Sequence, residues 1–193
     1  MTDGVAVVSY DCNSLRLLKG CHVEGTYAFG ATVRKEQVIK LVDAEAVRAN
    51  LPFGGRVLAK DLSAELSRGS TLDLGMMLVG RHRTTFKHVR NEKLRGGGAC
   101  AGATHLIRGA HVGAFAMDVG TRAEVAVTAM IEARSRSSKL ATYRDGDLAA
   151  CRRSTPDDTK AQPGCASILR VELIALGAGP GKQEGRAGRR PRR

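Results

Sequence analysis

The sequence predicts an α+β fold, built mainly on an antiparallel β-sheet of about four to six strands with one or two short helices. In three segments apolar and polar residues alternate with the period of two expected of half-buried strands: 71–83, 104–117 and 167–176. The 193-residue chain is long enough to bury a hydrophobic core of its own. We therefore expect a single domain over residues 1–176 and a disordered, basic Arg/Gly-rich tail over 177–193.

Further strands are expected on either side of these segments. Residues 5–11 and 22–33 have strand-like composition, and a turn at 118–121 leads into another alternating stretch over 122–132. Segment 57–67 is ambiguous, because its leucines also fit a helix at positions i, i+4 and i+8. The turn-forming residues that follow it favour a strand in a hairpin.

Helices are the minority element. Asp43 is a suitable N-cap for a short helix over 44–50, which proline and glycine then end. Residues 37–42 either extend this helix or form a separate strand. One or two helical turns are expected over 147–153, and loops over 88–102 and 154–164.

The positive charge is local. The net charge of +12 comes mostly from residues 81–95 and 182–193, each with six basic residues and one acidic residue. The first segment is expected to touch anionic envelope polymers or lipid head groups, although a solvated charged face is the simpler interpretation. Nucleic-acid binding through both segments is a weaker alternative, because no known motif supports it and aromatic residues are scarce. The candidate contact residues are Arg81, Arg83, Lys87, Arg90, Lys93 and Arg95.

Five cysteines are present, and none forms a Cys-x-x-Cys pair. Four of them fall into two local pairs that bracket turn-rich segments. We predict disulfides Cys12–Cys21 and Cys151–Cys165, with Cys100 left over. Spacing alone leaves five reduced thiols in a cytosolic protein as an equal alternative.

The sequence holds no candidate for a membrane-spanning helix, which needs about 18 apolar residues. No secretory signal is recognised at the N-terminus, which predicts either a soluble product or a precursor whose beginning is missing.

No catalytic, metal or cofactor site is predicted. His105 and His111 share a face of one expected strand but lie about 20 Å apart, too far to share an ion. Cys100 and His105 could form a nucleophilic pair, but no third residue is evident to orient them. Residues 145–147 resemble the start of a calcium loop, yet Pro156 stands where the final Glu is required, so helix capping is the simpler role.

Several short segments carry a resemblance to a known family. They are Val5-Ala6-Val7-Val8-Ser9-Tyr10-Asp11-Cys12, Leu51-Pro52, Cys100-Ala101-Gly102-Ala103-Thr104-His105, Val112-Gly113-Ala114-Phe115 and Arg144-Asp145-Gly146-Asp147. With these the chain resembles uncharacterised envelope lipoproteins of Gram-negative bacteria. The resemblance implies a non-catalytic binding or structural module in the periplasm or outer envelope. It also favours oxidised cysteines.

A second resemblance rests on Thr104, His105 and Gly113. Their spacing is similar to the membrane-attack-complex/perforin signature, Gly-Thr-His-aromatic followed after six residues by Gly-Gly. It implies a bent antiparallel sheet. Because only a short turn separates the expected strands, the alternative it implies is a degenerate perforin-like domain that contacts anionic membranes without insertion. A basic nucleic-acid-binding protein is the other alternative.

Overall fold

The computed structural model describes residues 4–11, 14–52, 59–67, 72–119 and 143–177. Within them nine β-strands and three short α-helices form, and all strand pairings but one are antiparallel. The predicted α+β class with a dominant antiparallel sheet is confirmed, but with more strands and helices than expected. Three strands have two residues each, too few for any periodicity to be visible in the sequence: β5 (Val89–Arg90), β6 (Leu94–Arg95) and β8 (Arg144–Asp145).

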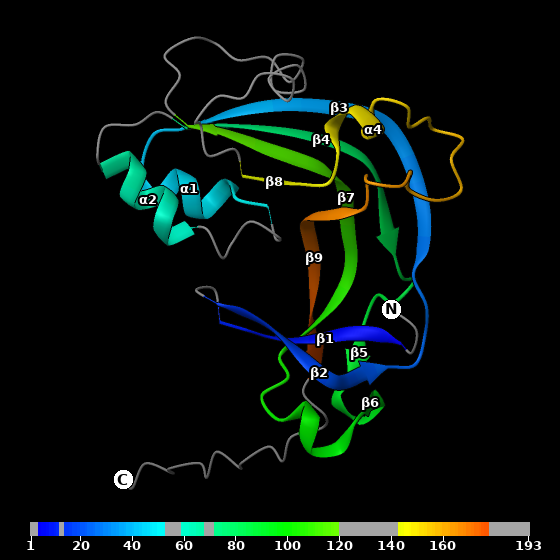
Figure 1. Cartoon of the computed structure of the whole chain (residues 1–193). Coiled ribbons are helices and arrows are strands. Elements are labelled where there is room, and N and C mark those ends of the chain that lie inside the picture. Colours follow the sequence, from blue (N-terminus) through cyan, green and yellow to red (C-terminus); the bar gives the residue numbers. More distant parts are fainter. Residues whose placement is uncertain (1–3, 12–13, 53–58, 68–71, 120–142, 178–193) are drawn as a thin grey trace, which may run out of the picture.

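Four long strands lie side by side in the order β3-β4-β7-β9 (Figure 1). Their bounds are β3 (Ala28–Leu41), β4 (Leu72–Arg83), β7 (His105–Val119) and β9 (Ser167–Gly177). The alternating pattern therefore located β4, β7 and β9 correctly. β7 continues through Val119, past the start of the turn predicted at 118–121, and the strand predicted over 122–132 lies outside the described residues.

An N-terminal hairpin crosses the lower part of the sheet in Figure 1. It consists of β1 (Val5–Tyr10) and β2 (Leu15–Val23), and β1 also pairs with the start of β7. The prediction of one continuous strand over 22–33 is wrong, because an irregular connection over 24–27 separates β2 from β3. Gly25 in this connection has φ +150°, and a Cβ there would lie 2.8 Å from Cε2 of Phe86.

Helices α1 (Ala44–Asn50) and α2 (Ala59–Ser67) lie together at one end of the sheet (Figure 1). α1 begins as predicted, with the Asp43 carboxylate accepting a hydrogen bond from the Ala46 amide at 2.7 Å. α2 corrects the strand favoured for 57–67. Its leucines, Leu62 and Leu66, are four residues apart, so a helix brings both to the core, where Leu62 is fully buried.

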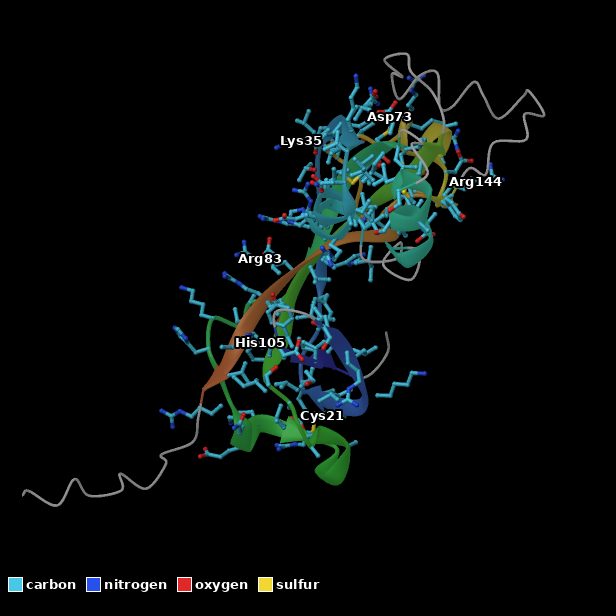
Figure 2. All side chains as sticks on the ribbon, turned by 90° about the vertical axis from the view of Figure 1, so that its left-hand side faces the viewer. Cys21, Lys35, Asp73, Arg83, His105 and Arg144 are labelled. Carbon is cyan, nitrogen blue, oxygen red and sulfur yellow. A yellow bond between two sulfur atoms is a disulfide. The ribbon has the colours of Figure 1, made fainter. Side chains whose placement is uncertain are left out.

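The long strands connect two hydrophobic regions. At the end near Asp73 and Arg144 (Figure 2), one cluster packs on the sheet beside α1 and α2, and a second packs beneath α4 (Leu148–Cys151). At the other end, near Cys21, a third cluster fills the space between the hairpin, β7 and β9. Between the two ends lies Arg83 (Figure 2), within ion-pair distance of Glu172.

Two disulfides link segments of the molecule. Cys151–Cys165 forms as predicted and closes the loop that follows α4. The second joins Cys21 on β2 to Cys100 at the end of the 3₁₀ helix η3 (Gly97–Cys100), 79 residues away in sequence.

The Cys12–Cys21 pairing is therefore wrong, and so is the free Cys100. Tyr10 pairs with Leu15, so the turn of the hairpin lies at the far end of β2 from Cys21. Cys12 itself lies outside the described residues.

No helix in the described part of the chain is long and apolar enough to cross a membrane. Gly177, which the sequence placed at the start of the tail, is the last residue of β9. The remainder of the predicted tail, 178–193, lies outside the described residues.

Candidate anion-binding site

The structure divides the six predicted contact residues into two groups. Arg90 on β5, Lys93 in the 3₁₀ helix η2 (Asn91–Lys93) and Arg95 on β6 line one pocket. Arg81 and Arg83 instead lie on β4 in the middle of the sheet. The sixth, the exposed Lys87, lies in the connection that follows β4 and does not line this pocket.

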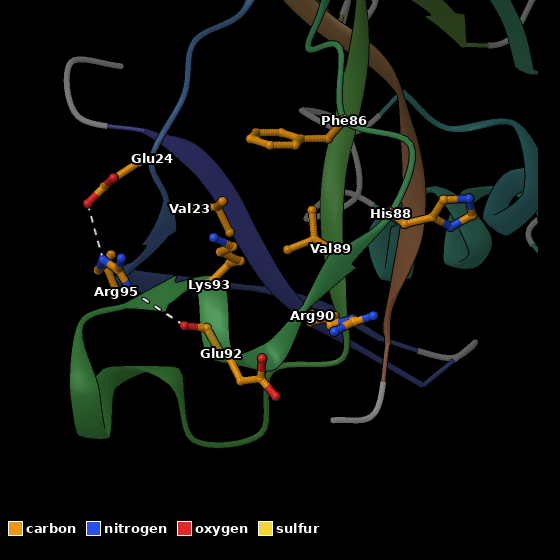
Figure 3. A pocket seen from close by; sticks show the side chains of 9 residues that line it. All are labelled: Val23, Glu24, Phe86, His88, Val89, Arg90, Glu92, Lys93 and Arg95. Atoms are coloured by element: carbon orange, nitrogen blue, oxygen red, sulfur yellow. Dashed lines mark hydrogen bonds and ion pairs between the residues drawn. The ribbon is translucent and has the colours of Figure 1, made fainter. Parts of the chain in front are cut away.

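The pocket is open to solvent and encloses about 650 Å³ (Figure 3). Two of its apolar side chains are almost fully buried, Val23 at 3% exposure and Val89 at 4%, and Phe86 is half-buried. Its charged side chains are exposed, so the pocket combines an apolar floor with a charged rim. The complete lining is Val23, Glu24, Phe86, His88, Val89, Arg90, Glu92, Lys93 and Arg95.

Short strand pairings fix the segment that carries the basic residues. β6 pairs with β2, which places Arg95 opposite His22, and β5 runs parallel to the end of β9, which places Val89 opposite Leu176. The Cys21–Cys100 disulfide then ties the end of this segment to β2. The basic rim is thus held from both sides although the segment contains little regular structure.

The charges on the rim are partly paired. Nε of Arg95 contacts Oε1 of Glu24 at 3.1 Å, and Nη1 of Arg95 donates to the backbone carbonyl of Glu92 at 3.5 Å (Figure 3). Within the described part of the chain, no carboxylate lies at ion-pair distance from Arg90 or Lys93. Because an exposed ion pair contributes little, an anionic ligand can compete for Arg95 while Arg90 and Lys93 are available to it.

The basic residues of the pocket were predictable from the sequence, but most of its other lining was not. Phe86 and Val89 lie inside the basic segment, and their apolar character there was the available signal. Val23, the last residue of β2, and Glu24, which follows it, come more than 60 positions earlier. Only the non-local β2–β6 pairing brings them to the site, and no local sequence pattern predicts this pairing.

Thr104 and His105, the first part of the perforin-like motif, hold β7 against β1. The Thr104 hydroxyl accepts from the Tyr10 amide at 2.8 Å and donates to the Tyr10 carbonyl at 3.2 Å. The ring of His105 packs edge-on against the ring of Tyr10. Gly113 lies eight residues further along β7, and a Cβ there would overlap the carbonyl oxygen of Met77. These residues serve strand packing and do not form one site.

The remaining chemical candidates have structural partners. The sulfur of Cys100 is bonded to Cys21, so it cannot act as a nucleophile in this oxidised form. Asp147 caps α4 by accepting hydrogen bonds from the amides of Ala149 and Ala150. Across the described ranges, no three histidine, cysteine, aspartate or glutamate side chains gather closely enough to hold a metal ion.

Comparison with protein-family models and with curated proteins finds no match to this chain. The interpretation of the pocket therefore depends on its own geometry and charge.

Proposed function

We propose that the protein is a non-catalytic binding module of the bacterial cell envelope whose basic pocket holds the phosphate head group of an anionic lipid. The observation that carries this proposal is that Arg90, Lys93 and Arg95 line one pocket together with the half-buried ring of Phe86. A ligand that suits both surfaces has an anionic group next to hydrocarbon, as an anionic phospholipid does.

Each part of the pocket matches a part of such a ligand. Arginine and lysine make charge-assisted hydrogen bonds to phosphate oxygens. The half-buried ring of Phe86 offers apolar contact to the glycerol and the first carbons of the acyl chains. The open shape of the pocket allows it to approach a head group that remains in the membrane.

The two disulfides support a place outside the cytoplasm. Disulfides persist in oxidising compartments such as the periplasm and are rare in the cytosol. Together with the resemblance to envelope lipoproteins, they favour an extracytoplasmic module that meets lipid surfaces.

Vesicle flotation at low ionic strength tests the proposal. We expect the full chain to float with vesicles of phosphatidylcholine and phosphatidylglycerol, and not with phosphatidylcholine alone. The triple variant Arg90→Gln/Lys93→Gln/Arg95→Gln should bind about 100-fold more weakly, at about 1 kcal/mol for each basic residue.

A matched control separates the pocket from general attraction. Lys35→Gln/Arg48→Gln/Lys160→Gln removes the same charge from exposed positions outside the pocket lining and should change binding little. Equal losses in the two triple variants, or no flotation of the wild type, would overturn the proposal. A nucleic-acid gel shift abolished by the pocket variant alone would replace it with the nucleic-acid alternative.

A further inference from the structure

A row of basic side chains crosses the middle of the sheet, apart from the pocket. Arg81 on β4 is directly opposite His111 on β7, and His111 is directly opposite Arg170 on β9. Residues opposite one another in antiparallel strands share a face, so these three side chains lie on the same face. The two arginines are two strands apart, about 10 Å at the backbone, with His111 between them.

The next row on this face supplies one carboxylate. Arg83 and Glu172 are both opposite Gly109, and a Cβ at Gly109 would lie 3.4 Å from Oε2 of Glu172 and 3.6 Å from Cγ of Arg83. Oε1 of Glu172 lies 3.1 Å from Nε2 of His111, and Oε2 lies 3.9 Å from Nε of Arg83. The Glu172 carboxylate therefore partly offsets the positive charge of Arg83 and also contacts His111.

Arg81 and Arg170 differ from Arg83 in having no carboxylate partner at ion-pair distance among the described residues. Three arginines and one glutamate give this face a formal charge of +2 before any charge on His111. An external anion placed between Arg81 and Arg170 would be attracted to both of them.

The face is also accessible. Arg170 is exposed, and 36% of the Arg83 side chain and 32% of the His111 side chain are exposed. Gly30 on β3 continues the first row beyond Arg81, and a Cβ at this position would meet nothing within 4 Å. Space is therefore open beside Arg81 for a ligand to enter.

We propose that Arg81, His111 and Arg170 form a second ligand site, which binds a phosphate dianion of the phosphomonoester type. Two guanidinium groups provide planar pairs of donors that match phosphate oxygens, and the ring of His111 lies between them in the same row. The charge of such a dianion balances the +2 of the face. This site shares no lining residue with the pocket, so it does not depend on the lipid proposal.

Calorimetric titration with inorganic phosphate at low ionic strength tests the site. We expect saturable binding by the wild type and at least tenfold weaker binding by Arg81→Gln/Arg170→Gln. The control variant Lys35→Gln/Arg48→Gln, which loses the same charge at exposed positions outside both sites, should bind inorganic phosphate as the wild type does. No binding by the wild type, or equal losses in the two variants, would overturn the proposal.

A variant that is expected to bind phosphate more tightly distinguishes an effect on the site from misfolding. Glu172→Gln removes the anion that competes for His111 and Arg83, so phosphate should bind several-fold more tightly. Weaker binding by this variant, with an unchanged circular dichroism spectrum, would contradict the proposed charge balance.

Flotation with vesicles that contain phosphatidic acid identifies the source of the phosphate. If Arg81→Gln/Arg170→Gln weakens flotation as well as calorimetric binding, the site takes a lipid phosphomonoester. If it weakens calorimetric binding alone, the site takes a soluble one.

Discussion

At the scale of single residues, close backbone approaches explain where glycine is required in this sheet. A Cβ added at Gly113 on β7 would overlap the carbonyl oxygen of Met77 on β4 and would come within 3.0 Å of Cδ1 of Leu169 on β9. Backbone cannot move aside as a flexible side chain can. The strands on both sides of β7 would therefore have to shift to admit a methyl group.

We expect Gly113→Ala to lower the free energy of unfolding by about 2 kcal/mol, since overfilling a packed interior forces backbone displacement. Gly30→Ala is the matched control, because open space surrounds that position, and its effect should stay within about 0.5 kcal/mol. Urea denaturation with intact disulfides measures both changes. Similar values for the two variants would show that the approach to Met77 does not constrain position 113.

At the scale of elements, irregularities in two strands are joined by one side chain from the turn between β2 and β3. The register of β1 shifts next to Ala6, and the register of β7 shifts next to Ile107. The Tyr27 hydroxyl accepts from the Ala6 amide at 3.1 Å and donates to the Ile107 carbonyl at 2.7 Å. Tyr27 thus satisfies backbone groups beside both irregularities and fixes the turn to the sheet.

Burial raises the pKa of the Tyr27 hydroxyl, although the hydrogen bond from Ala6 acts in the opposite direction. A raised pKa means that the folded state keeps its proton to higher pH than the unfolded chain does. The stability from this group is complete below the unfolded pKa of about 10 and is lost as pH rises through the folded pKa.

We expect Tyr27→Phe to cost about 1–2 kcal/mol at neutral pH, because two backbone groups lose their partner. The difference from the wild type should shrink in alkaline solution above pH of about 10. Denaturation across this range measures the effect, and a difference that stays constant with pH would contradict it.

At the scale of the whole molecule, the sequence patterns predicted elements that depend on neighbouring residues. They did not predict contacts between segments that are distant in the sequence. The long alternating segments gave β4, β7 and β9, and the Asp43 cap gave the start of α1. The segment that became α2 has a leucine spacing that fits either element, and only burial of Leu62 in the core selects the helix. The basic rim of the pocket was visible as a charge run, whereas the contribution of Glu24 depends on the β2–β6 pairing.

The two disulfides show the same contrast between local and distant contacts. The Cys151–Cys165 bridge closes a loop of 14 residues and was predictable from spacing, whereas Cys21–Cys100 spans 79 residues and depends on the tertiary fold. Closing the longer loop removes more entropy from the unfolded chain. In the chain-entropy model the two bridges contribute about 3 and about 4.5 kcal/mol.

We therefore expect Cys21→Ser/Cys100→Ser to lose more stability than Cys151→Ser/Cys165→Ser, by about 1–2 kcal/mol in urea denaturation. The longer bridge should also be the more important one for ligand binding, because it anchors the segment that carries Lys93 and Arg95 to β2. Alkylation in denaturant, with mass measurement, verifies that each double variant keeps its other disulfide. A greater loss from the Cys151 and Cys165 variant would mean that the loop after α4, and not the link between β2 and η3, dominates the stability of the domain.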